Sequence, residues 1–147
     1  IDSGLREILD DLVLKQKVPV LGVCVGMQMM AKESEEGVMP GLGWLDAKVK
    51  HFNQNNLSPD IHFPHMGWND VEPKFQNELF TDIVDPRFYF LHSYYFSPEN
   101  LSQSLATTEY GIKFTSATAS DNIYGVQFHP EKSHSWGIQL LRNFSGI

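Results

Sequence analysis

A short strand-to-helix turn around the chain's only cysteine constrains the fold more than any other stretch. Residues 17–30 read Lys-Val-Pro-Val-Leu-Gly-Val-Cys-Val-Gly-Met-Gln-Met-Met. The apolar run at 18–23 is too short for a helix and is typical of a buried parallel strand. Cys24 then stands between Gly22 and Gly26, and glycines leave room for a strand and a helix to pack closely. This pattern predicts a nucleophile elbow, a strained turn that presents a reactive side chain at the end of a sheet.

The position of Cys24 favours a nucleophile over a structural cysteine. Taken alone, a single cysteine is more often a small buried hydrophobe. At the start of a helix, however, free backbone N–H groups and the helix dipole favour an anion. We therefore expect the Cys24 thiol to ionise more easily than a free thiol.

The composition fits one globular domain and excludes several classes of protein. The 147 residues are 41% hydrophobic and 20% charged, which suffices for one sizeable core. A net charge of −7 without a basic run argues against a nucleic-acid partner. No apolar run approaches the roughly 18 residues of a membrane span, so no membrane partner is expected. A single cysteine cannot form an internal disulfide, which fits a reducing, cytoplasmic location.

Hydrophobic periodicity predicts an α/β fold. Helices are expected over 4–16, 25–32 and 135–144. Strands are expected over 18–23, at 88–96 as a central strand, and as a meander of three within 105–129. The last helix is expected to bury Ile138 and Leu141. Because a helix that leads into a parallel strand usually follows earlier strands, we expect the domain to be incomplete at its N-terminus.

A second motif supplies a base and a carboxylate. Gly-Val-Gln-Phe-His-Pro-Glu occupies 125–131. Thiolate chemistry needs a base for the thiol proton and a third group to orient that base. His129 and Glu131 lie two residues apart, so both can point to the same side of an extended segment. Alone, they would be a hydrogen-bonded strand-end histidine and a solvated carboxylate; together with Cys24 they predict a catalytic triad.

These two motifs resemble those of the class I (triad) glutamine amidotransferases. Longer motifs of the chain are similar to those of the glutaminase subunits of imidazole glycerol phosphate synthase. These motifs are Gly22-Val-Cys-Val-Gly-Met-Gln28, Ser34-Glu-Glu-Gly37, Pro64-His-Met-Gly-Trp-Asn69, Phe90-Leu-His-Ser-Tyr94 and Phe128-His-Pro-Glu-Lys-Ser133. The resemblance covers nearly all of the chain. It implies one amidotransferase domain over 1–147, with a flavodoxin-like three-layer fold and a central, mostly parallel sheet that lacks its N-terminal strands. It implies no cofactor.

The resemblance also implies a mechanism. Cys24 attacks the side-chain amide of L-glutamine, His129 carries the proton to the departing ammonia, and Glu131 orients His129. Other site residues follow from the same resemblance: Gln28, Glu36, Ser93 and Tyr94 for the amino-acid end of the substrate, and the Val25 N–H as one oxyanion donor. Without the resemblance, Gln28 would be a helix-surface amide, and Ser93 and Tyr94 simple strand-end packing.

A cyclase (βα)8-barrel subunit is the implied heterodimer partner. It would receive the ammonia and form imidazole glycerol phosphate in histidine biosynthesis, and the segment 65–69 would lie near it. Two alternatives stay open: a paralogue that supplies ammonia for amidination of a surface-polysaccharide sugar, and a non-catalytic binding fragment. A γ-glutamyl hydrolase fits Gln28 and the Ser34-Glu-Glu motif less well.

The sequence lacks the pattern of a metal site and the glycine-rich loop of the family. His62 and His65 stand at i and i+3, but no third ligand is near in sequence, so no metal site is expected. The glycine-rich loop that supplies the family's second oxyanion donor has no match within 1–16.

Overall fold

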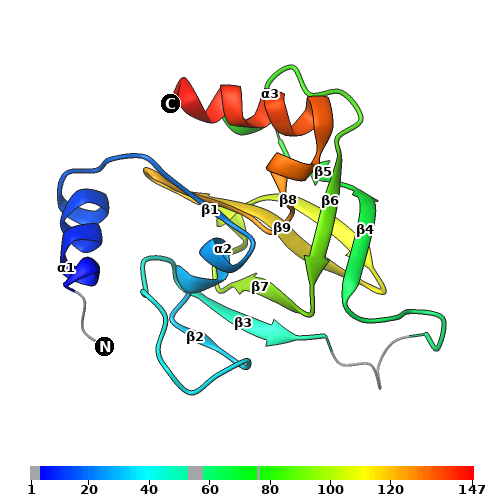
Figure 1. The fold of residues 1–147 in the computed structure, drawn as a ribbon, viewed down its shortest axis with the longest axis horizontal. Coiled ribbons are helices and arrows are strands. Elements are labelled where there is room, and N and C mark those ends of the chain that lie inside the picture. Colours follow the sequence, from blue (N-terminus) through cyan, green and yellow to red (C-terminus); the bar gives the residue numbers. More distant parts are fainter. Residues whose placement is uncertain (1–3, 53–57, 76) are drawn as a thin grey trace.

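A computed structural model describes residues 4–52, 58–75 and 77–147, and helices flank a curled mixed sheet in it (Figure 1). The helices are α1 (Leu5–Asp10), which continues as a π-helix over Asp11–Lys15, α2 (Val25–Met29) and α3 (His134–Ser145). Short 3-10 turns occupy Glu78–Phe80, Leu101–Gln103 and Pro130–Lys132. None of the helices described is long and apolar enough to cross a membrane.

The described strands form two sheets. They are β1 (Val20–Val23), β2 (Glu33–Ser34), β3 (Ala47–His51), β4 (His65–Asp70), β5 (Glu72–Pro73), β6 (Arg87–His92), β7 (Tyr94–Pro98), β8 (Ser104–Tyr110), β9 (Ile112–Ser120) and β10 (Ile123–Val126). The larger sheet has the order β1-β10-β9-β7-β3-β2, with β8 paired to β9 and β5 paired to β8. The second sheet consists of β4 and β6.

The α/β fold class is confirmed, but the sheet is mixed rather than mostly parallel. Among the described ladders, β1–β10 and β2–β3 are parallel, and the others are antiparallel. The reason lies in the connections. Short turns join β8, β9 and β10, and a parallel pair would need a crossover of a dozen or more residues.

The predicted central strand at 88–96 is wrong in its details, because the chain changes sheets there. β6 ends at His92 and pairs with β4, whereas β7 begins at Tyr94 and pairs with β3 and β9. Phe88 and Phe90 of β6 and Phe96 of β7 are all fully buried. The aromatic run therefore supplies the core from two strands that belong to different sheets.

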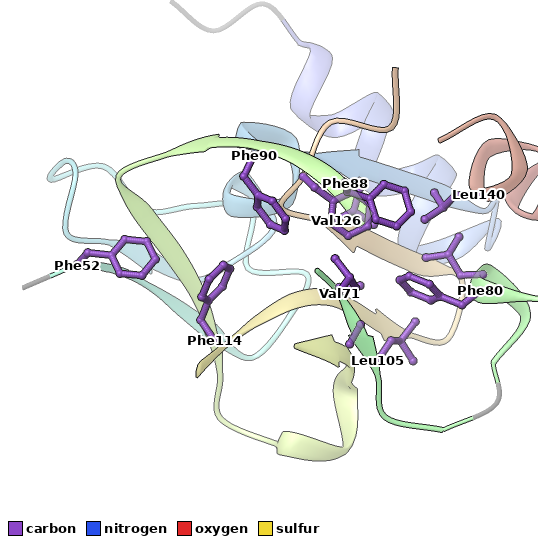
Figure 2. Packing of buried hydrophobic residues seen from close by; sticks show 13 residues of the cluster. Phe52, Val71, Phe80, Phe88, Phe90, Leu105, Phe114, Val126 and Leu140 are labelled. Carbon is purple, nitrogen blue, oxygen red and sulfur yellow. The ribbon is translucent and has the colours of Figure 1, made fainter. Parts of the chain in front are cut away.

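The main core is aromatic and lies between β6, the large sheet and α3. The rings of Phe88 and Phe128 stack with centroids 4.0 Å apart. Figure 2 shows Phe90, Phe114 and Leu140 pointing into the same interior from β6, β9 and α3. Each such side chain contributes about 1.5–3 kcal/mol through removal of apolar surface from water.

The helix α3 buries a different face from the predicted one. Ile138 is 61% exposed and Leu141 is 41% exposed, whereas Gly137 and Leu140 face the core. A Cβ atom at Gly137 would lie 1.8 Å from the carbonyl oxygen of Pro130. The close approach that glycine permits here turns the helix so that Leu140, rather than its neighbours, is buried.

The strand β1 and the helix α2 form the predicted elbow. Cys24 has φ 51° and ψ −108°, a strained conformation for an L-residue. A Cβ atom at Gly22 would lie 2.7 Å from backbone atoms of Gly26 and Met27, so glycine is needed for α2 to pack on β1. The same expectation for Gly26 is wrong, because a Cβ atom there meets nothing within 4 Å.

We predict opposite effects of alanine at the two glycines of the elbow. Gly22→Ala should lower the free energy of unfolding by about 2 kcal/mol or more, because backbone atoms must move apart. Gly26→Ala should leave it unchanged or raise it by up to about 1 kcal/mol, since alanine favours the helix. Urea denaturation measures both values. An equal loss in the two variants would contradict this account of the elbow.

Candidate active site

Cys24 and His129 lie at the same edge of the sheet because they follow neighbouring parallel strands. Val23 at the end of β1 is in register with Val126 at the end of β10. The Cys24 N–H donates to the carbonyl of Val126 over 2.8 Å, which joins the elbow directly to the strand that leads to His129. The parallel pairing thus places the end of β1, which leads to Cys24, beside the end of β10, which leads to His129, across about a hundred residues of sequence.

His129 and Glu131 form the predicted pair. The Nδ1 atom of His129 lies 2.7 Å from the Oε1 atom of Glu131. With Nδ1–H donated to the carboxylate, the Nε2 atom of His129 is left to accept a proton. Pro130 begins the 3-10 turn that carries the carboxylate back toward the ring.

A buried serine that sequence reasoning missed holds this segment in place. The Ser133 hydroxyl donates to the carbonyl of His129 over 2.6 Å and accepts from the N–H of Tyr89 over 3.0 Å. The His129 N–H in turn donates to the Tyr89 carbonyl over 2.8 Å. Two hydrogen bonds to one residue of β6 therefore fix the backbone around His129.

Cys24 is buried, and its ionisation differs from the prediction. Burial raises the pKa of the thiol, whereas the Val25 N–H and the Gln127 side chain act in the opposite direction. The Gln127 Nε2 atom lies 3.6 Å from Sγ. The expectation of easy ionisation is wrong because desolvation outweighs these donors, and α2 is only five residues long. The thiol therefore needs a base to ionise it.

A pocket of about 210 Å³ opens beside the thiol. Its lining includes Cys24 and all five residues predicted to contact substrate or oxyanion: Val25, Gln28, Glu36, Ser93 and Tyr94. Leu91 and His92 complete the lining. Pockets for drug-sized ligands measure about 300–1,000 Å³, so this one suits a ligand of amino-acid size.

Gln28 is held in one orientation within the pocket and is not a helix-surface amide. Its Nε2 atom lies 3.0 Å from the carbonyl oxygen of Tyr94 and 3.0 Å from the Oε1 atom of Gln127. Gln127 is fully buried, and the prediction did not include it. Its signal in the sequence is an amide side chain between the apolar residues Val126 and Phe128, directly after β10 and two residues before His129.

The histidines at 62 and 65 do not form a pair. The Nδ1 atom of His65 lies 2.9 Å from the Nε2 atom of His92 instead, across the β4–β6 ladder. Over the ranges 4–52, 58–75 and 77–147, no three histidine, cysteine, aspartate or glutamate side chains gather in a way that could hold a metal ion.

Comparison with known proteins identifies the family of the chain. Residues 5–145 match the family described as Glutamine amidotransferase class-I. The chain belongs to this family. The resemblance drawn from the two sequence motifs is therefore confirmed, and so is the fold class that it implied.

Comparison with individual relatives shows which members of the family this amidotransferase is similar to. It is 56% identical over 147 residues to the imidazole glycerol phosphate synthase subunit HisH of Bdellovibrio bacteriovorus, and 50% identical over 147 residues to that of Leptospira interrogans. Each match covers 99% of this chain and 72% of the relative. A solved glutamine amidotransferase from Thermotoga maritima has a TM-score of 0.62 at 22% identity, covering 97% of this chain and 54% of that one, which shows the fold alone.

The buried His65–His92 pair makes stability depend on pH. Burial lowers the pKa of His65 from 6.5 to about 3 and that of His92 from 6.5 to about 4. Both rings are therefore neutral in the folded protein, whereas the unfolded chain binds protons on them below about pH 6.5. Protonation then favours the unfolded state, so the free energy of unfolding falls as the pH drops from about 6.5 toward about 4.

We predict a loss of up to about 1.4 kcal/mol per pH unit for each of the two histidines between about pH 6.5 and 5. Chemical denaturation at several pH values measures the slope. His65→Phe combined with His92→Phe should flatten it, while His62→Phe, at an exposed histidine, should leave it unchanged. An unchanged slope in the double variant would contradict the neutral state of the pair.

Proposed function

We propose that this chain is the glutaminase subunit of an imidazole glycerol phosphate synthase. It hydrolyses L-glutamine to glutamate and ammonia and passes the ammonia to a cyclase (βα)8-barrel partner in histidine biosynthesis, a cytoplasmic pathway. Family membership and 56% identity to a HisH subunit support the proposal. The observation that carries it is the pocket in which Gln28, Glu36, Ser93 and Tyr94 surround the nucleophile.

The triad performs the reaction in two halves. The Nε2 atom of His129 takes the thiol proton, and the Cys24 sulfur attacks the amide carbon of glutamine. The tetrahedral intermediate collapses, the C–N bond breaks, and His129 returns the proton to the leaving ammonia. Water, deprotonated by His129, then attacks the thioester, the C–S bond breaks, and the proton on His129 returns to the Cys24 sulfur as glutamate leaves. Glu131 keeps the imidazole in the required tautomer throughout.

The pocket offers complementary groups to the rest of the substrate. Gln28 presents its Oε1 atom and Glu36 its carboxylate, both acceptors that suit the α-ammonium group of glutamine. Ser93 and Tyr94 also line the pocket, and the Tyr94 carbonyl lies next to Gln28, 3.0 Å from its Nε2 atom. The Val25 N–H follows the nucleophile directly and serves as one donor to the oxyanion.

The β4–β6 pair offers an apolar face for the cyclase close to the nucleophile. Met66 is 64% exposed, and Trp68 and Leu91 on the same pair are partly exposed. The indole of Trp68 stacks on His134 with centroids 5.3 Å apart. The carbonyl oxygen of Leu91 lies 3.7 Å from the Cys24 Sγ atom, so this face and the site share one strand. A partner seated here would receive ammonia near its point of release.

The first test separates glutaminase from cyclase activity. With a cyclase partner, Cys24→Ala should reduce glutamine-dependent product by about 10³-fold or more, because the nucleophile is gone, while ammonia-dependent product persists. A glutamine-analogue electrophile should also leave an adduct on Cys24 of the unsubstituted protein, seen by mass spectrometry. Absence of the adduct with and without the partner would overturn the proposal, and formation of an amidinated sugar in place of imidazole glycerol phosphate would reassign the acceptor.

The second test concerns the carboxylate of the triad. Glu131→Gln should lower kcat for glutamine hydrolysis by about 10²–10⁴-fold with little change in KM, because the amide no longer stabilises the imidazolium. Steady-state kinetics measures both constants. Glu7→Gln, at an exposed carboxylate of α1, is the matched control. Wild-type kcat in the Glu131 variant would remove this residue from the mechanism.

A further inference from the structure

The two buried histidines at 65 and 92 have no part in the triad, yet His92 lines the substrate pocket and His65 is hydrogen-bonded to it. Only 2% of His65 and 6% of His92 is exposed. They face each other across the β4–β6 ladder, and their rings are joined by a 2.9 Å hydrogen bond. His65 also stacks between Phe90 and Tyr110, with centroids 4.6 and 3.9 Å away. A polar pair enclosed in this way needs a hydrogen-bond partner at each ring nitrogen.

The two ends of the pair determine the direction of its hydrogen bonds. The Nδ1 atom of His92 lies 2.7 Å from the carbonyl oxygen of Tyr94, which can only accept, so Nδ1 carries the hydrogen. The Nε2 atom of a neutral His92 then accepts from Nδ1–H of His65. At the other end, the Nε2 atom of His65 accepts from the side-chain amide of Asn69 over 3.2 Å. Two neutral rings thus satisfy every nitrogen in one direction.

The same carbonyl of Tyr94 also orients the substrate pocket. It accepts from the Nε2 atom of Gln28 over 3.0 Å, and that nitrogen also donates to Gln127 over 3.0 Å. Both amide hydrogens of Gln28 are therefore committed. Its Oε1 atom is the one left for a ligand, and it can only accept a hydrogen bond.

We propose that His65 and His92 are positioning residues, which hold the Tyr94 carbonyl so that Gln28 turns its Oε1 atom toward the α-ammonium group of the substrate. The inference rests on the proposed function. It adds two positioning residues to that function and the direction of the hydrogen bonds that run through them. Asn69 anchors the far end, because its amide also donates to the carbonyl of Glu109 over 2.9 Å. The chain of hydrogen bonds therefore runs from β4 to the pocket without a gap.

Kinetics with L-glutamine and the cyclase partner tests the role. His92→Phe keeps the ring shape but removes the donor to Tyr94, and KM for glutamine should rise about tenfold, the effect of one lost hydrogen bond. kcat should change by less than about threefold, because the α-ammonium group is bound equally in the ground and transition states. His92→Asn keeps a donor at the position of Nδ1 and should restore KM to within about threefold of wild type.

The controls distinguish positioning from stability and from the proposed function itself. His62→Phe should match wild type, and ammonia-dependent product should persist in every variant. A wild-type KM in folded His92→Phe, or an Asn variant as impaired as the Phe variant, would overturn the positioning role while glutaminase activity stands. If wild type itself fails to hydrolyse glutamine with the partner, the proposed function fails and takes the positioning role with it.

Nitrogen-15 NMR of the histidine rings reports the direction of these hydrogen bonds, and the measurement does not require catalytic activity. The geometry requires the Nδ1–H tautomer for both His65 and His92 in the unsubstituted protein. An Nε2–H tautomer at either ring would reverse the hydrogen bonds and overturn the inference, even where His92→Phe fails to fold.

Discussion

The parallel pairing of β1 with β10 is the interaction on which the rest of the structure depends. It joins Val20–Val23 to Ile123–Val126 and places Cys24 beside the segment that carries His129. Asn122, just before β10, reinforces the junction, because its side-chain amide donates to the carbonyls of Val13 and Val18 over 2.9 and 2.8 Å. The helical segment before β1 is thereby tied to the start of β10, the strand that leads to His129.

Around this junction, packing and reactivity impose opposite demands on Cys24. The elbow needs a buried, strained turn, and burial disfavours the thiolate. Hydrogen-bond donors at the sulfur offset part of this effect. The candidate base, His129, is held by Glu131 at its Nδ1 atom. In the proposed reaction the thiol therefore depends on His129 for ionisation, and not on its position at a short helix.

The β4–β6 pair combines two roles because alternate residues of a strand point to opposite sides. On one side, Met66 and Trp68 are open to a partner. On the other, His65 and His92 are enclosed by aromatic rings and bonded toward the pocket.

The sequence by itself determined the elbow, the pairing of His129 with Glu131 and the family, because these depend on residue types at short spacing: Cys24 between glycines, and His129 two residues before Glu131. Only the tertiary structure decided the direction of the thiol pKa, the buried face of α3 and the change of sheets after His92. It also decided the role of Gln127, which meets Gln28 across 99 positions of sequence. Burial, close approach and the direction of hydrogen bonds all depend on neighbours that are distant in sequence. Local sequence patterns therefore carry no information about them.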